Sequence, residues 1–207
     1  MENKQVLIIN GHPDQESFNN ALAAAYQKGA ETSDAVVSLL NIRELYFNPN
    51  LEFGYRKRIN LEPDLLSSIE KIKAADHLVW VFPMWWYGYP ALMKGFIDRT
   101  FLPGIMFDYE PGKTVSKKLL KGKTARIIMT ADTPKLYDRL FMKSPALNQF
   151  KKGTLQFCGV NPVKVSYIAP IKSSSEEFRK KYLLELSKLS NGKQFVTDKM
   201  PQNFCFI

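Results

Sequence analysis

The sequence has few cysteines, no long apolar run and no recognisable sorting signal. Its 207 residues include two cysteines, Cys158 and Cys205, too few for a disulfide framework and not arranged as a CxxC metal or redox pair. No apolar stretch approaches the roughly 20 residues of a membrane span, and residues 1–10 lack a signal-peptide pattern. We therefore expect a cytoplasmic protein with reduced cysteines, no membrane insertion and no metal site.

Acidic residues are outnumbered: 29 Lys and Arg face 20 Asp and Glu, giving a formal net charge of +9. Such a surplus raises the question of nucleic-acid binding. The basic residues gather in 113–123, 151–152 and 179–181, but no helix-turn-helix, zinc-finger or RNA-binding signature accompanies them. We expect solvated loops and helix faces with no nucleic-acid partner. Attraction of an anionic cofactor is a third explanation, and the charge alone does not choose among them.

Hydrophobic residues make up 45% and charged residues 24% of the chain, which excludes disorder, collagen and coiled coil. Short apolar runs alternate with amphipathic segments. The first run, VLIIN, has no polar alternation, as expected of a strand buried on both faces. The predicted strands are 6–10, 35–40, 77–82, 125–130 and 163–168, and the predicted helices are 17–31, 62–75, 90–101, 144–157 and 175–190. This alternation predicts an α/β fold, a doubly wound five-stranded parallel sheet with helices on both faces.

The chain shows no linker that would divide it, so we expect one domain over residues 1–191. Two helix starts are marked in the sequence: Ser17 is a plausible N-cap, and Pro63 opens the second helix. The tail, residues 192–207, is apolar enough to need cover on its own domain or on a partner subunit.

Ligands of an open parallel sheet bind at the carboxyl ends of its strands, which directs attention to the loops there. Residues 10–19, after the first strand, contain neither a Walker loop nor GxGxxG. This polar loop leads directly into a helix N-terminus, where backbone N–H groups favour a phosphate. His12, Ser17 and Asn19 are candidate donors. A simpler interpretation is that Ser17 only caps the helix and His12 only completes a turn.

The loop after the third strand, residues 83–91, contains Pro and Gly residues and four large aromatic residues, Trp85, Trp86, Tyr87 and Tyr89. Aromatic faces at the carboxyl edge of a sheet suit a planar ring system, and Gly88 permits close backbone approach. A dimer contact is the alternative, because Trp and Tyr are also enriched at interfaces.

Two further segments give weaker signals. Residues 130–134 carry small and hydroxyl side chains that suit the polar edge of a ligand, although a simple turn explains them equally. Residues 104–109 are predicted to be a loop despite their apolar content, which is typical of a binding site or an interface.

Together these residues resemble the flavodoxin-like NAD(P)H:quinone oxidoreductase family of the DT-diaphorase type, with its smaller bacterial members. The similarity lies in VLIINGHPDQESFN, in PMWWYGYPALMKGFIDRTFLPG with FDY behind it, and in LQFCGV at residues 155–160. These blocks occur in order across residues 4–170. The second block is specific, because a proline–aromatic–aromatic turn seldom coincides with PAxxKGxxDRxF.

The resemblance implies a flavodoxin-like homodimer that binds FMN or FAD and carries electrons from NADH or NADPH to a quinone or similar acceptor. By position, the residues holding the flavin-phosphate region are His12, Ser17, Phe18 and Asn19. The loop cradling the isoalloxazine ring contains Pro83, Met84, Trp85, Trp86, Tyr87 and Gly88. The other polar edge of the ring is met by Thr130, Ala131, Asp132 and Thr133. The aromatic pair that lines the family's substrate cleft across the dimer interface is matched by Phe107 and Tyr109.

The chain departs from the best-known members at two places. Their fourth-strand loop is rich in glycine, whereas this chain has Ala131-Asp132-Thr133-Pro134. Six residues beyond the tyrosine that matches Tyr137 they carry a histidine implicated in stabilising charge on the reduced flavin. Lys143 stands at that position, so we expect Tyr137 and Lys143 to act as the catalytic donors.

The mechanism expected from the resemblance is hydride transfer from a nicotinamide, followed by reduction of an acceptor in the same cleft, with ping-pong kinetics. Two alternatives remain open. One is a regulatory or electron-carrier flavoprotein, such as an ancillary subunit of a potassium efflux system, which looks similar. The other is a nucleic-acid-binding protein on the same scaffold, which predicts steeply salt-dependent binding to DNA or RNA.

Overall fold

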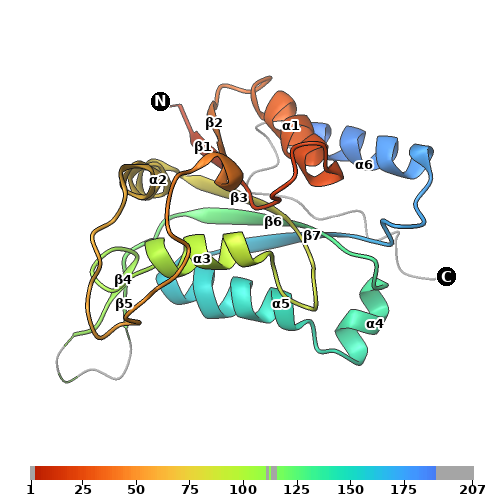
Figure 1. Ribbon diagram of the computed structural model, residues 1–207. Helices are drawn as coiled ribbons and strands as arrows, with labels where there is room; N and C mark the ends of the chain where they lie inside the picture. The colour runs from red at the N-terminus through yellow and green to blue at the C-terminus, as the bar shows by residue number, and fades with distance from the viewer. Residues whose placement is uncertain (1–2, 111, 113–115, 190–207) are drawn as a thin grey trace.

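The computed structural model describes residues 3–110, 112 and 116–189, and its centre is a parallel sheet (Figure 1). The sheet has five strands in the order β2–β1–β3–β6–β7. Their bounds are β1 (Gln5–Asn10), β2 (Val36–Asn41), β3 (His77–Pro83), β6 (Thr124–Thr130) and β7 (Val163–Ile168). All five predicted strands are confirmed to within one residue at each end. The order is that of the flavodoxin-like α/β fold.

Helices cover both faces of the sheet, as predicted (Figure 1). On one face, α1 (Phe18–Ala30) and α6 (Glu176–Leu189) enclose a core that includes Leu22, Tyr26 and Leu186. The other face is covered by α2 (Pro63–Ala74), α3 (Ala91–Thr100) and η2 (Asn148–Gln156), with a larger core around Trp80, Phe96 and Phe150. Each helix places its apolar stripe on the sheet, because burial of that stripe is the main source of stability.

The two helix starts expected from the sequence are present. Ser17 caps α1, and its side chain accepts a hydrogen bond from the N–H of Asn20. Pro63 is the first residue of α2, where its missing N–H costs nothing, and Asp64 lies in the first turn.

Several short elements differ from the prediction. Helix α4 (Lys135–Leu140) and the 3-10 turn η1 (Ile42–Glu44) were not expected. The helix predicted at 144–157 consists of α5 (Pro145–Leu147) followed by the π-helical η2. Within the segment expected to be a loop, β4 (Phe107–Asp108) pairs antiparallel with β5 (Lys117–Lys118). Strands of two residues and a six-residue helix are too short to show a periodic pattern.

Two further expectations concern the C-terminal tail and membrane spans. The tail at 192–207 lies outside them. Within residues 3–110, 112 and 116–189, no helix combines the length and apolar character needed to cross a membrane.

Candidate functional site

His12 is a neutral donor beside the end of β1. Its backbone N–H donates to Asn10 Oδ1 (3.1 Å), and its Nδ1 accepts the N–H of Asp14 (3.0 Å). Partial burial lowers the pKa of His12, and the Asp14 carboxylate opposes that shift only in part. A neutral imidazole that accepts at Nδ1 carries its proton on Nε2. The Nε2–H of His12 therefore remains to donate to a ligand.

The start of α1 presents backbone donors. Ser17 Oγ accepts the N–H of Asn20 at 3.2 Å and donates to the carbonyl of Asp14 at 2.8 Å, which fixes the cap. The N–H groups of Phe18 and Asn19 precede the first intrahelical hydrogen bond, and they lie at the positive end of the helix dipole. This part of the loop has the donors and the field that an anionic group requires.

Asn19 holds a buried amide with an unused donor. Its side chain is 4% exposed, and its Oδ1 accepts the hydroxyl of Thr130, the last residue of β6, at 2.9 Å. The Nδ2 group of Asn19 is buried with no hydrogen-bond partner among the described residues. A buried polar group without a partner is costly and rare in a native protein. The geometry indicates that an acceptor from a ligand completes the site at this point.

The loop after β3 forms a tight turn that displays two tryptophans. Trp85 and Gly88 exchange both backbone hydrogen bonds, at 3.0 and 2.9 Å. Between them Trp86 and Tyr87 adopt φ values of 50° and 57°, the left-handed region that L-residues seldom occupy. Trp85 is 45% exposed and Trp86 fully exposed. Two bulky residues held in this conformation store strain, which is typical of a functional loop.

This aromatic turn is joined to both neighbouring loops. The N–H of Met84 donates to the carbonyl of Thr130 at 2.7 Å, which ties the turn to the end of β6. The rings of His12 and Trp85 meet edge to face, with centroids 5.5 Å apart. The three loops predicted to bind one cofactor therefore meet at the carboxyl edge of β1, β3 and β6.

The loop after β6 is fixed by contacts with Tyr167 and Lys172, which the sequence did not single out. Tyr167, on β7, donates its hydroxyl to the carbonyl of Thr133 at 2.8 Å. Burial, together with the negative charge of Asp138, raises the pKa of Tyr167, so it remains a protonated donor. Asp132 accepts the N–H of Lys172 at 2.6 Å, and Ala131 is buried. These contacts make the loop rigid without glycine.

Tyr137 and Lys143 lie beyond that loop, on and after α4 (Figure 1). Tyr137 is 47% exposed and stacks on Phe141, with centroids 5.0 Å apart. Lys143 is exposed and has a φ of 60°. Between them Asp138 is 1% exposed, and its Oδ1 has no partner among the described residues. The sequence does not predict this buried acceptor, because a single Asp in a polar stretch gives no recognisable pattern.

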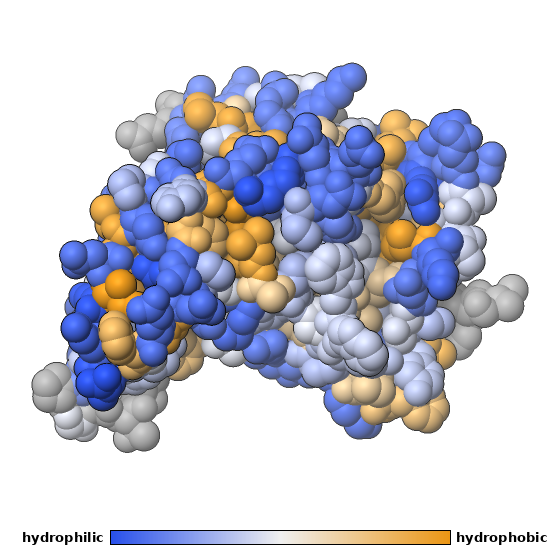
Figure 2. All heavy atoms as spheres, viewed as in Figure 1, coloured by the Kyte–Doolittle hydropathy of each residue, from blue (hydrophilic) through white to orange (hydrophobic). Residues whose placement is uncertain are grey.

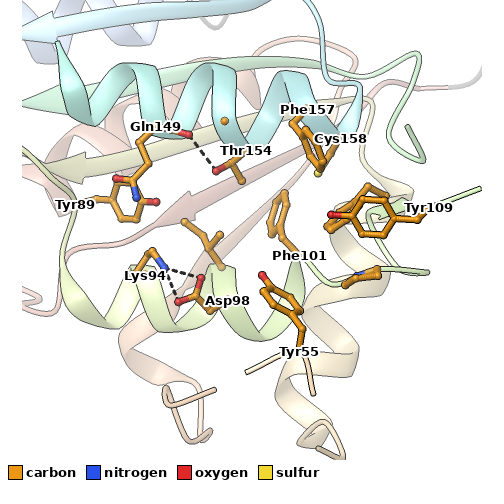
Figure 3. Close-up of a pocket in the computed structure, with 14 residues that line it drawn as sticks. Tyr55, Tyr89, Lys94, Asp98, Phe101, Tyr109, Gln149, Thr154, Phe157 and Cys158 are labelled. Atoms are coloured by element: carbon orange, nitrogen blue, oxygen red, sulfur yellow. Dashed lines mark hydrogen bonds and ion pairs between the residues drawn. The ribbon is translucent and has the colours of Figure 1, made fainter. Parts of the chain in front are cut away.

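Phe107 and Tyr109 line a different cavity, of about 560 Å³, between α3, β4 and η2 (Figure 3). The ring of Phe107 is in edge contact with Tyr109 at 5.4 Å and with Phe157 at 5.0 Å. None of the residues predicted to hold the flavin lines this cavity. The other lining residues, which were not among the predicted site residues, include Tyr55, Tyr89, Lys94, Asp98, Phe101 and Cys158.

The cavity contains few groups able to take part in proton transfer. Burial raises the pKa of the Cys158 thiol to about 12, so the thiol stays protonated. Burial, assisted by Asp98, also raises the pKa of Tyr89 to about 12. Lys94 and Asp98 neutralise each other through an ion pair of 2.5 Å. We call the cavity lined by Phe107 and Tyr109 the aromatic cavity.

Comparison with known proteins agrees with the fold. A family model described as "Flavodoxin-like fold" matches residues 4–189. The human ribosyldihydronicotinamide dehydrogenase (quinone) is 27% identical over 205 residues, which cover 87% of each chain. An uncharacterised NAD(P)H oxidoreductase of Haemophilus influenzae is 28% identical over 179 residues, 84% of this chain and 88% of the relative.

A solved structure is also similar. The crystal structure of Smu.1420 from Streptococcus mutans has a TM-score of 0.74 and 30% sequence identity, covering 90% of this chain and 98% of that one. The family model spans most of the chain, the sheet has the flavodoxin-like strand order, and the relatives align over more than four-fifths of their length. The chain therefore belongs to the flavodoxin-like fold family, as a homologue of its NAD(P)H quinone oxidoreductases.

Proposed function

We propose that this protein is a flavin-dependent NAD(P)H oxidoreductase that reduces a quinone or a similar acceptor by two electrons. In balance, NAD(P)H, a proton and a quinone give NAD(P)⁺ and the hydroquinone. The observation that carries the proposal is the unpartnered Asn19 amide at the meeting point of the three loops. The names of the relatives support the same chemistry, since the human protein is a quinone dehydrogenase and the Haemophilus protein an NAD(P)H oxidoreductase.

The residues present fit a flavin, either FMN or FAD. The start of α1 and His12 Nε2–H supply donors for a phosphate, and Asn19 Nδ2 supplies a donor beside them. Trp85 provides a half-exposed aromatic face next to these donors, suited to a planar ring. Thr130 to Thr133 stand at the facing edge, where Tyr167 keeps the backbone in place.

A bound flavin would supply the two-electron chemistry, and the protein would supply binding and orientation. Hydride transfer needs no general base, which accords with the absence of a second histidine from these loops. The exposed turn at Trp86 leaves room for a nicotinamide or an acceptor to approach. We assign to Tyr137 and Lys143 the role of donors that offset negative charge at the edge of the cofactor.

Asn19→Asp should weaken flavin binding at least tenfold. The substitution keeps the oxygen that accepts from Thr130 but replaces the unpartnered donor with an acceptor and adds a negative charge next to the phosphate region. A lost hydrogen bond to a charged group costs about 1.5–3 kcal/mol. The measurement is a fluorescence titration of the apoprotein with FMN and with FAD, and Tyr46→Ala, which alters an exposed aromatic residue on another loop, is the control.

An absorption spectrum of the flavin-treated protein tests the proposed function. Wild-type protein should retain a flavin band after desalting, and the band should bleach when NADPH or NADH is added without oxygen. Retained flavin that neither nicotinamide bleaches would contradict the oxidoreductase proposal and favour a carrier or regulator. Equal flavin affinity for wild type and Asn19→Asp would contradict the site.

We also propose that the working form is a homodimer. Phe107, Tyr109 and Phe157 form an aromatic wall, but within one chain this wall lines its own cavity, apart from the flavin loops. A second copy of the chain can bring such a wall over the cofactor of the first. In such a dimer the rings of Tyr109 and Trp86, which are exposed in the single chain, would be buried in the interface.

Tyr109→Ala should raise the KM for a quinone about tenfold and leave the flavin content unchanged, because an aromatic contact at a desolvated site is worth about 1.4 kcal/mol. Sedimentation equilibrium should give twice the 23.7 kDa mass of the chain. A monomer with full activity would disprove the assembly. A loss of flavin in Tyr109→Ala would place the residue at the cofactor instead of the acceptor.

A further inference from the structure

The loop of residues 51–59 carries more positive than negative charge, with three cations and one acid. Arg56, Lys57 and Arg58 are consecutive and exposed, and they form no ion pair with any described carboxylate. Arg56 and Lys57 both lie over the ring of Phe53, at 5.7 and 5.0 Å from its centroid. Figure 2 shows hydrophilic residues, with hydrophobic ones among them, at this end of the molecule. The three charges are therefore held in one place rather than dispersed.

Two of these cations line a small cavity of about 190 Å³. Lys57 and Arg58 form part of its wall, with Tyr55, Leu102 and Pro103. Arg58 donates from Nη2 to the carbonyl of Pro103, which fixes its guanidinium next to the turn that leads to β4. No acidic residue is among the residues that line the cavity.

Two other charged groups belong to this region. Arg99 reaches the same cavity, but its guanidinium binds Glu62 at 2.7 Å. Glu52, the one acid of the loop, accepts a hydrogen bond from the neutral amide of Asn48 at 2.8 Å and does not line the cavity. Lys57 and Arg58 are therefore the cations at the cavity without an ion-pair partner among the described residues, and such a pair attracts an anion.

The small cavity adjoins the aromatic cavity, because Tyr55 and Pro103 line both. A molecule whose ring lies between Tyr55 and Phe107 can place a substituent near Lys57 and Arg58. The charged residues that line the larger space are Lys94 and Asp98, which pair with each other, so it suits an uncharged ring. One ligand with a flat ring and a negative group would satisfy both.

We infer that Lys57 and Arg58 form an anion subsite that selects aromatic substrates carrying a sulfonate, carboxylate or phosphate group. The inference rests on the proposed function in one respect, that the aromatic cavity receives the substrate ring. Two kinds of molecule present this chemistry. One is an anionic acceptor such as 1,4-naphthoquinone-2-sulfonate, and the other is NADPH, whose adenosine carries a 2′-phosphate.

The test is calorimetric titration of the flavin-treated protein with compounds that it cannot reduce. Naphthalene-2-sulfonate should bind about tenfold more tightly than 2-naphthol at low salt, as expected of charge-assisted hydrogen bonds. The Lys57→Gln/Arg58→Gln variant should lose this preference. Lys28→Gln/Lys188→Gln removes the same charge from α1 and α6, on the opposite face of the sheet, and should keep it.

Adenosine 2′,5′-bisphosphate, titrated in parallel, separates the two sources of the anion. If Lys57→Gln/Arg58→Gln loses affinity for the bisphosphate, the subsite binds the 2′-phosphate of NADPH. If the variant loses affinity only for the sulfonate, the subsite binds the anionic group of the acceptor. Equal affinities for sulfonate and naphthol, or a preference that survives in Lys57→Gln/Arg58→Gln, would overturn the inference. Because no turnover is required, a protein that fails to oxidise NADPH yet shows the charge preference would contradict the proposed function and leave the subsite standing.

Discussion

Replacing Arg99 by Met is expected to lower the free energy of unfolding by about 3 kcal/mol, the low end of the cost of breaking a buried ion pair. Arg99 is 1% exposed on α3 and donates to Glu62 and to the carbonyls of Asn48 and Asn60. The low end applies because the Glu62 side chain remains 23% exposed and regains some hydration when its partner is lost. Arg99 thus ties segment 48–62 to the helix.

The acid dependence of unfolding should change in the same variant. Burial of Glu62 acts to raise its pKa, but hydrogen bonds from the backbone N–H groups of Asn48 and Glu62, with the charge of Arg99, outweigh burial and lower it. A carboxyl group with a lowered pKa in the folded state stabilises the protein above its ordinary pKa and loses that effect as the pH falls. Without Arg99 this loss on acidification should be smaller.

Urea unfolding at pH 7 and at pH 4 measures both effects. Arg56→Met, which removes an exposed arginine, should change the free energy of unfolding by less than about 0.5 kcal/mol. Arg99→Met/Glu62→Gln should recover part of the lost stability, since it removes the stranded charge. If Arg99→Met unfolds like the wild type, the ion pair does not hold this segment.

Gly95→Ala should destabilise the fold by about 3 kcal/mol, although alanine is a better helix former than glycine. A Cβ at residue 95 of α3 would lie 2.4 Å from Pro49 Cβ and 2.7 Å from the Pro49 carbonyl oxygen. These distances are far below contact, and the carbonyl belongs to backbone that cannot rotate away. Helix α3 must therefore move off the 48–50 segment or push it outward.

Gly153→Ala is the matched control and should have the opposite sign. The nearest atom to its added Cβ is the Asn148 carbonyl oxygen at 3.8 Å, an ordinary contact. Reduced freedom of the unfolded chain should then stabilise the protein by about 0.5 kcal/mol. Thermal unfolding of both variants measures the difference, and equal melting temperatures would contradict the close packing of α3.

Strands β1 and β3 could be predicted because each is a continuous apolar run, the pattern expected of a strand buried on both faces. Ser17 could be predicted because a cap is a local signal. In contrast, α4 buries only Asp138 of its six residues, so it has no apolar stripe to read. The free amide of Asn19 depends on Thr130, which is 111 positions away, and no local pattern reveals such a contact.

The aromatic cavity shows the same limit. Phe107 and Tyr109 were singled out by the resemblance, but Tyr55 and Phe157 join them only through the tertiary structure. A lone Tyr in a polar stretch is indistinguishable from a surface residue until the chain is folded. The charge surplus was visible from the start, whereas the placement of Lys57 and Arg58 on one cavity was not.

The packing of α6 on α1 has a consequence for how the chain is made. Leu186, near the end of α6, belongs to the same core as Leu22, Tyr26 and Ala30 of α1. The first and last described helices therefore form the core on one face of the sheet together. On a translating ribosome the part of this core that α6 completes stays uncovered until synthesis has passed α6. We expect the nascent chain to expose this apolar surface for most of its synthesis, which makes chaperone protection during translation more important than after release.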